Sequence, residues 1–213
     1  MEIISNFNNI QKIVKLISPK SKIVAVTKNF SLDYIEPLIL SGHLEYGENR
    51  VQEAAIKWGN LIKTNNNIIL HFIGKLQTNK AEDAVKIFKF IHSLDSIKLA
   101  EKLSAAEKKL NKKIKYFIQV NISNEPQKAG INEKDLPTFI KFCKVNLNLD
   151  VIGLMCIPAV NANSKLSFLK LRDLATNNTL QELSMGMSND YEDALKAGST
   201  YLRIGSAIFG NRN

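Results

Sequence analysis

Short apolar segments alternate with amphipathic segments along almost the whole chain, and this alternation limits the folds it can adopt. Eight apolar runs occupy residues 23–28, 44–49, 69–74, 90–95, 116–122, 151–156, 182–187 and 201–206. Between several of them, at 51–63, 96–110, 133–145 and 190–197, apolar residues recur at helical spacing. Buried strands that alternate with helices form a parallel sheet with both faces covered. About eight such units are the number that closes a (β/α)8 barrel.

An open, doubly wound sheet is the alternative fold. That fold normally has fewer strands and a glycine-rich turn after the first one, whereas Lys28, Asn29 and Phe30 end and follow the first apolar run here. We therefore predict an α/β fold, a TIM barrel that occupies residues 1–213 as a single domain. Residues 1–19 have one apolar helical face, which predicts an extra N-terminal helix that plugs or flanks the bottom of the barrel.

Composition and charge narrow the class of protein. The net charge of +9 comes almost entirely from lysine, and arginine is sparse. Proteins that bind nucleic acid usually combine lysine with arginine and exposed aromatic residues, so we expect no nucleic-acid partner.

No segment is long and apolar enough to span a bilayer. Cys143 and Cys156 are too far apart for a CxxC motif and too few for a disulfide framework. We expect a cytoplasmic protein without a membrane partner.

Polar residues collect where the predicted strands end, which is the end of a (β/α)8 barrel that carries its chemistry. Lys28 ends the first apolar run and shares a strand face with Val24 and Val26. If that face is the barrel interior, burial lowers the pKa of the lysine toward the nucleophilic amine that imine chemistry needs. The alternative is a lysine whose ammonium group reaches out to solvent.

A turn near the C-terminus is suited to binding phosphate. In barrels of this kind, phosphate is often bound by the loops after the seventh and eighth strands and by a short extra helix. Gly205 allows the backbone to approach an anion, the Ser206 hydroxyl can donate to it, and Ser188 faces the same place from the seventh strand. An amine and a phosphate site together suggest a covalently held phosphorylated aldehyde.

Arg203 precedes this turn and has more than one possible role. It lies on the strand face of Tyr201 and Gly205, so it points either into the barrel or outward against a helix. An inward guanidinium needs an acceptor, because a buried unpaired charge is unfavourable. A heteroaromatic ring nitrogen would serve, and a neighbouring carboxylate is the alternative partner.

The chain resembles the pyridoxal 5'-phosphate homeostasis proteins, a family similar to the N-terminal barrel of alanine racemase. The resemblance rests on AVTK, GENRVQEA, HFIGKLQTNK, IHSLDS, QVNIS with KAGI, GLMCIP and LSMGMSNDYEDALKAGSTYLRIGSAIFG. It implies a fold-type III barrel that holds pyridoxal 5'-phosphate (PLP) as an imine (Schiff base) on Lys28. It also implies that Ser188, Gly205 and Ser206 hold the phosphate, that Arg203 faces the ring nitrogen, and that Asn49 lies beside the ring.

The resemblance also frames the function. Alanine racemase completes its site with a second domain that carries a tyrosine base, whereas this chain ends at Asn213 and offers Lys28 as its one base. Racemisation needs proton removal on one face and delivery on the other. We therefore expect a carrier that buffers PLP and delivers it to PLP-dependent apoenzymes, with little or no turnover. Whether it has any enzymatic activity stays open. We expect a monomer, and Lys128 is either a second amine for loading or an exposed surface lysine.

Two alternatives remain. One is a PLP-dependent amino-acid racemase, which would need a second base. The other is a phosphosugar isomerase or aldolase of the barrel class, which would use a carboxylate, and of Glu45, Glu48 and Asp95 the last two are expected near the rim. The histidines His43, His71 and His92 show no metal-ligand spacing, so we expect no metal.

Overall fold

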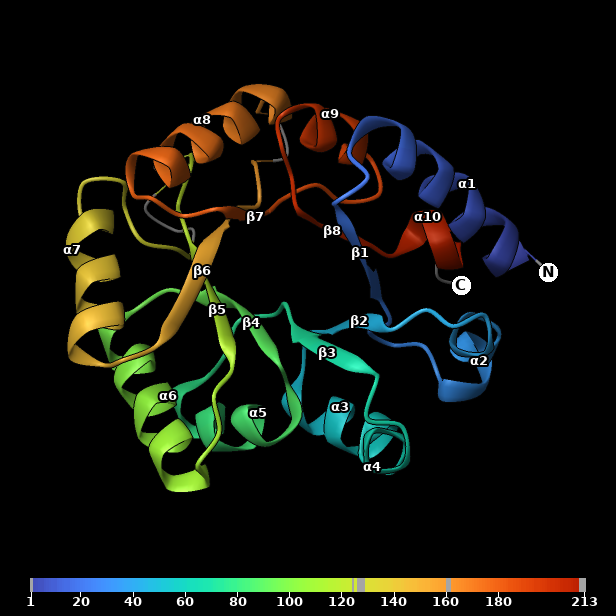
Figure 1. Ribbon diagram of the computed structural model, residues 1–213, viewed down its shortest axis with the longest axis horizontal. Coiled ribbons are helices and arrows are strands. Elements are labelled where there is room, and N and C mark those ends of the chain that lie inside the picture. Colours follow the sequence, from blue (N-terminus) through green and yellow to red (C-terminus); the bar gives the residue numbers. More distant parts are fainter. Residues whose placement is uncertain (1, 124, 126–128, 160–161, 211–213) are drawn as a thin grey trace.

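The computed structural model describes residues 2–123, 125, 129–159 and 162–210. In this part of the chain, eight parallel strands form a closed barrel in sequence order, and β8 pairs back with β1 (Figure 1). The strands are β1 (Lys22–Val26), β2 (Glu45–Glu48), β3 (Ile69–Phe72), β4 (Phe90–Leu94), β5 (Lys115–Gln119), β6 (Asp150–Met155), β7 (Glu182–Ser184) and β8 (Tyr201–Ile204). The TIM barrel predicted from the alternating pattern is confirmed.

Helices surround the strands in an outer layer (Figure 1). They are α1 (Glu2–Ile17), α2 (Leu32–Leu40), α3 (Val51–Trp58), α4 (Leu61–Thr64), η1 (Thr78–Lys80), α5 (Ala81–Ile87), α6 (Ile97–Leu110), α7 (Leu136–Lys141), η2 (Phe142–Asn146), α8 (Ser164–Asn177), α9 (Tyr191–Lys196) and α10 (Ser206–Phe209). Serine side chains accept backbone hydrogen bonds at the start of two helices, Ser31 before α2 and Ser96 before α6. Such N-caps satisfy amides that have no partner within the helix.

The apolar core has two parts. The larger part fills the space between the strands and the outer helices. The smaller part lies inside the barrel and consists of Val24, Phe90, Phe117, Met155 and Tyr201. Side chains alternate between the two faces of each strand, so the outward face of a strand contributes to the larger part and the inward face to the smaller part. The barrel interior is therefore packed with side chains and is not an open pore.

The N-terminal helix does not plug the bottom of the barrel. Helix α1 lies along the outer wall and contacts α2, α9 and α10 (Figure 1). Its buried residues are Phe7, Ile10 and Val14, and the Asn6 side chain donates a hydrogen bond to the Ile208 carbonyl. Because α2 follows β1 and α9 follows β7, α1 lies in the outer layer between these two helices, where it packs on the short helix α10 that follows β8.

Some predicted boundaries differ from the observed ones. The helix predicted at 51–63 is divided into α3 and α4 at Gly59 and Asn60. The one predicted at 133–145 begins later, has Pro137 in its first turn and ends in the π-helical segment η2. Strand β1 ends at Val26, so Lys28 follows the strand and does not belong to it. The last difference gives Lys28 a loop backbone at the edge of the barrel.

Candidate functional site at the strand ends

Lys28 and the turn at Gly205 lie on the same part of the barrel rim. Strands β1 and β8 are paired with Ala25 opposite Ile204, so Val26 and Gly205 follow side by side. A Cβ atom added to Gly205 would lie 3.4 Å from the Cβ atom of Val26. Lys28 comes two residues after Val26 and is half-buried. Closure of the barrel thus brings the loop with Lys28, from the start of the chain, to the same part of the rim as a turn from its end.

The turn after β8 presents two backbone amides to one oxygen atom. The Ser188 hydroxyl oxygen accepts hydrogen bonds from the Gly205 amide at 3.3 Å and from the Ala207 amide at 3.1 Å. Ser206 lies between these donors in sequence and is exposed. Converging backbone N–H groups of this kind form concave sites that favour anions. Ser188 and this turn are therefore brought together as the sequence predicts.

Arg203 points inward and is buried, with 5% of its surface exposed. Its NH1 group donates to the Ser184 hydroxyl at 2.7 Å, and its NH2 group donates to the Cys156 carbonyl at 3.0 Å. Among the described residues, no carboxylate forms an ion pair with this guanidinium. Burial lowers the pKa of Arg203, although an arginine stays protonated in proteins. The charge is buried, and its direct partners are neutral.

Two rim asparagines each retain an oxygen without a partner. The Oδ1 atoms of Asn49, which follows β2, and of Asn121, which follows β5, are buried and accept no hydrogen bond within the described part of the chain. The Asn121 amide nitrogen donates to the Glu125 carbonyl at 2.8 Å. Buried polar atoms are normally hydrogen-bonded. These two oxygens therefore suit a polar ligand or ordered water at the barrel mouth.

Glu48 belongs to a structural cluster on the other side of β2. Its side chain is fully buried, and its Oε1 atom accepts hydrogen bonds from the Thr27 hydroxyl at 2.7 Å, the Lys57 ammonium at 2.7 Å and the Trp58 indole at 2.9 Å. Lys57 also donates to the Thr27 carbonyl at 2.7 Å. These contacts tie α3 to the loop that carries Lys28. Glu48 lies near the rim as expected, but it is held in place as an anchor.

A line of polar side chains crosses the barrel interior, and sequence reasoning missed it. It contains Glu45, His71, His92 and Ser184, and it reaches Arg203. Strand alternation placed His71 and His92 on the inward faces of β3 and β4, which was the available signal. The spacing of these histidines in the sequence bears only on metal binding. Within the described residues, no group of three histidine, cysteine or carboxylate side chains could hold a metal ion.

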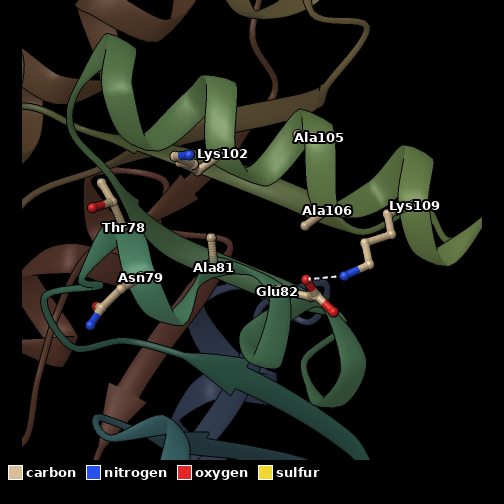
Figure 2. A pocket seen from close by; sticks show the side chains of 8 residues that line it. All are labelled: Thr78, Asn79, Ala81, Glu82, Lys102, Ala105, Ala106 and Lys109. Atoms are coloured by element: carbon tan, nitrogen blue, oxygen red, sulfur yellow. Dashed lines mark hydrogen bonds and ion pairs between the residues drawn. The ribbon is translucent and has the colours of Figure 1, made fainter.

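A surface hollow lies in the outer helical layer. It has a volume of about 410 Å³ and lies between η1, α5 and α6 (Figure 2). Its walls include Thr78, Lys102 and two alanines of α6, and the Glu82–Lys109 ion pair, 2.9 Å long, links α5 and α6 at its edge.

Lys128, the other lysine considered from the sequence, lies outside the described residues. None of the described helices is long and apolar enough to cross a membrane.

The fold and the rim together define a barrel of the alanine racemase type. The family model for the N-terminal domain of alanine racemase matches residues 5–213. A structure of alanine racemase from Clostridium difficile superposes with a TM-score of 0.77 over 99% of this chain and 57% of that one. At 15% identity, that similarity shows the fold alone.

More similar proteins define the family within this class. The pyridoxal phosphate homeostasis protein of Synechocystis is 35% identical over 210 residues, which cover 94% of this chain and 96% of the relative. The Pseudomonas aeruginosa protein of the same name is 37% identical over 196 residues, covering 90% and 84%. A structure of PipY from Synechococcus elongatus without PLP has a TM-score of 0.90 at 32% identity, covering 98% of this chain and all of PipY. PipY with PLP bound has a TM-score of 0.87. The chain belongs to the pyridoxal phosphate homeostasis protein family.

Proposed function

We propose that this protein binds PLP through Lys28 and acts as a carrier that buffers the cofactor and delivers it to PLP-dependent apoenzymes. The observation that supports the proposal is the pairing of β1 with β8, because the loop with Lys28 and the turn with Gly205 follow these two neighbouring strands. Family membership supports the choice of cofactor, since relatives are named for PLP homeostasis and PipY has been solved with PLP bound. When bound, PLP supplies an electrophilic aldehyde carbon and a conjugated ring.

The residues after β7 and β8 fit the phosphate. The Gly205 and Ala207 amides already converge on the Ser188 oxygen, so this turn supplies donors for a tightly placed oxygen atom. The Ser188 and Ser206 hydroxyls can donate two further hydrogen bonds. We assign Ser188, Gly205 and Ser206 to phosphate binding.

Arg203 and Asn49 fit the ring. A guanidinium has five N–H donors and no acceptor, so Arg203 can donate to an unprotonated ring nitrogen in addition to Ser184 and Cys156. A ring nitrogen held in this way stays unprotonated, which weakens the ring as an electron sink. The unpartnered Oδ1 atom of Asn49 suits a polar group of the cofactor. The contact of Arg203 with the ring nitrogen would favour storage of the cofactor over carbanion chemistry.

The rim carboxylates do not favour an enzyme that transfers protons beside Lys28. The Oε1 atom of Glu48 is held by three donors. Asp95 follows β4, and strands β2 and β3 separate it from Lys28. Glu45 lies at the opposite end of the barrel, where it pairs with Lys22 and His71. A racemase or a phosphosugar isomerase needs a second proton-transfer group, so a carrier is the function that we propose.

PLP retention and proton exchange test this function together. After PLP loading and dialysis, the wild-type protein should retain the cofactor, whereas Lys28→Ala should lose it. Lys63→Ala is a matched control, because Lys63 is an exposed lysine of α4. The loaded protein, incubated with amino acids in D₂O, should leave their chirality unchanged and incorporate little deuterium at Cα. Racemisation that depends on Lys28 would show that the protein is an enzyme and not a carrier. If Lys28→Ala retained as much PLP as the wild type, the assignment of Lys28 as the anchor would be wrong.

A further inference from the structure

A continuous chain of hydrogen bonds crosses the barrel from Glu45, near its N-terminal end, to Arg203. The Glu45 carboxylate contacts the His71 Nε2 atom at 2.5 Å, and the His71 Nδ1 atom lies 2.9 Å from the His92 Nε2 atom. The His92 Nδ1 atom lies 2.7 Å from the Ser184 hydroxyl, which is 2.7 Å from the Arg203 NH1 group. His71, His92 and Ser184 are fully buried. We call these five residues the barrel relay.

The donor and acceptor capacities of the side chains fix the direction of the relay. Arg203 can only donate, so the Ser184 oxygen accepts from it and the Ser184 hydrogen is directed to the His92 Nδ1 atom. The proton of a neutral His92 must then be on Nε2, from which it is donated to the His71 Nδ1 atom. His71 in turn donates from Nε2 to the Glu45 carboxylate. Only this arrangement of protons satisfies every hydrogen bond of the relay, and in it each group donates toward Glu45, starting from Arg203.

The ionisation of these groups agrees with this pattern. Burial lowers the pKa of His71, and burial together with His71 and the charge of Arg203 lowers the pKa of His92 well below the usual value, which favours the neutral form of both rings. Burial alone would raise the pKa of Glu45, but the hydrogen bond from His71 and the ammonium of Lys22 hold it below its ordinary value. Lys22 lies 3.2 Å from Glu45 and is half-exposed. An ionised acceptor thus lies at one end and a buried cation at the other.

We propose that Glu45, His71, His92 and Ser184 are positioning residues, which hold the Arg203 guanidinium in one orientation and stabilise its charge from across the barrel. A buried cation without a carboxylate beside it is unfavourable, and a chain of polarised hydrogen bonds that ends at a carboxylate compensates for it. The inference rests on the proposed function in one respect: the group that Arg203 serves is the cofactor ring. The relay itself belongs to the protein without ligand.

Nuclear magnetic resonance of the ligand-free protein tests the direction of the relay. In protein labelled with ¹⁵N-histidine, long-range ¹H–¹⁵N spectra report which ring nitrogen carries the proton. Both His71 and His92 should be neutral, with the proton on Nε2, from pH 6 to pH 8. His43, which contacts the Glu45 carbonyl outside the relay, completes the assignment through a His43→Gln spectrum. A charged His92, or a proton on its Nδ1 atom, would overturn the proposal.

Substitution of His92 separates positioning from packing. His92→Ala and Ser184→Ala remove a link, and each should shift the absorption band of bound PLP and weaken its affinity about five- to thirtyfold. His92→Gln should recover most of both, because its amide can accept from Ser184 and donate to His71. His43→Gln is the control and should match the wild type. If the folded His92→Ala, Ser184→Ala and His92→Gln variants all bind PLP with the wild-type spectrum and affinity, the relay does not position Arg203.

The two proposals fail in different ways. If every variant, including Lys28→Ala, still bound PLP, the proposed anchor would be wrong. The histidine protonation pattern of the ligand-free protein would still support the relay. A contrary histidine pattern with Lys28-dependent binding would remove the relay and leave the carrier function in place.

Discussion

The hydroxyl of Ser188 and the amide of Gly205 lie 3.3 Å apart, although they follow different strands. Their contact exists because β7 and β8 are neighbours in the closed barrel, so the loops after them meet. The same closure sets β1 on the other side of β8 and brings Lys28 to this edge. Three segments that are separated in sequence thus meet at one edge of the barrel.

Ser188→Ala should weaken PLP binding through the phosphate. The variant keeps the Gly205 and Ala207 amides but removes one hydroxyl donor, and a hydrogen bond to a charged group contributes about 1.5 to 3 kcal/mol. We expect the Kd for PLP to rise about tenfold or more. Pyridoxal, which lacks the phosphate, should bind both proteins equally. Absorbance titration measures both affinities. An equal loss of affinity for the two ligands would show that Ser188 does not act on the phosphate.

Glu48→Ala should destabilise the fold. The substitution removes the shared acceptor of Thr27, Lys57 and Trp58 and leaves buried donors without a partner, so the free energy of unfolding should fall by about 3 to 5 kcal/mol. Urea denaturation followed by far-UV circular dichroism measures this change.

Glu53→Ala is the matched control for Glu48→Ala. Glu53 pairs with Arg50 on the exposed side of α3, and such a pair contributes less than about 1 kcal/mol. Similar losses in the two variants would contradict the anchoring role of Glu48.

Stability should decrease as the pH falls through the histidine range. Burial lowers the pKa of His92 well below its usual value, so His92 stays neutral in the folded protein while the unfolded chain titrates near pH 6.5. The unfolded state therefore binds more protons below pH 6.5, and the free energy of unfolding falls there. Between pH 7.5 and pH 5.5, this one residue should account for a loss on the order of 1 kcal/mol.

The comparison with His92→Gln isolates that contribution. The variant should lose on the order of 1 kcal/mol less than the wild type over the same pH interval, because glutamine does not titrate. Urea denaturation at the two pH values measures both proteins. An identical pH dependence would mean that His92 is not held neutral by the fold.

The sequence predicted the barrel because each strand–helix unit carries its own apolar pattern. It also predicted which residues lie at the rim, because parallel strands all end on one side. It did not predict that Arg203 has no carboxylate partner among the described residues, or that His71 and His92 are linked. Alternation gives the face on which a side chain lies, whereas its partner across the barrel depends on strand register and on side-chain conformation. The break at Gly59 and the position of α1 likewise depend on tertiary packing.

The most direct test of the carrier account is to locate the bound cofactor chemically. Protein produced without added vitamin B6 is treated with borohydride, digested and analysed by peptide mass spectrometry. The account predicts one phosphopyridoxyl group, on the peptide that contains Lys28, and no such group in Lys28→Ala. A label on another lysine, or a label that persists on the same site in Lys28→Ala, would contradict it.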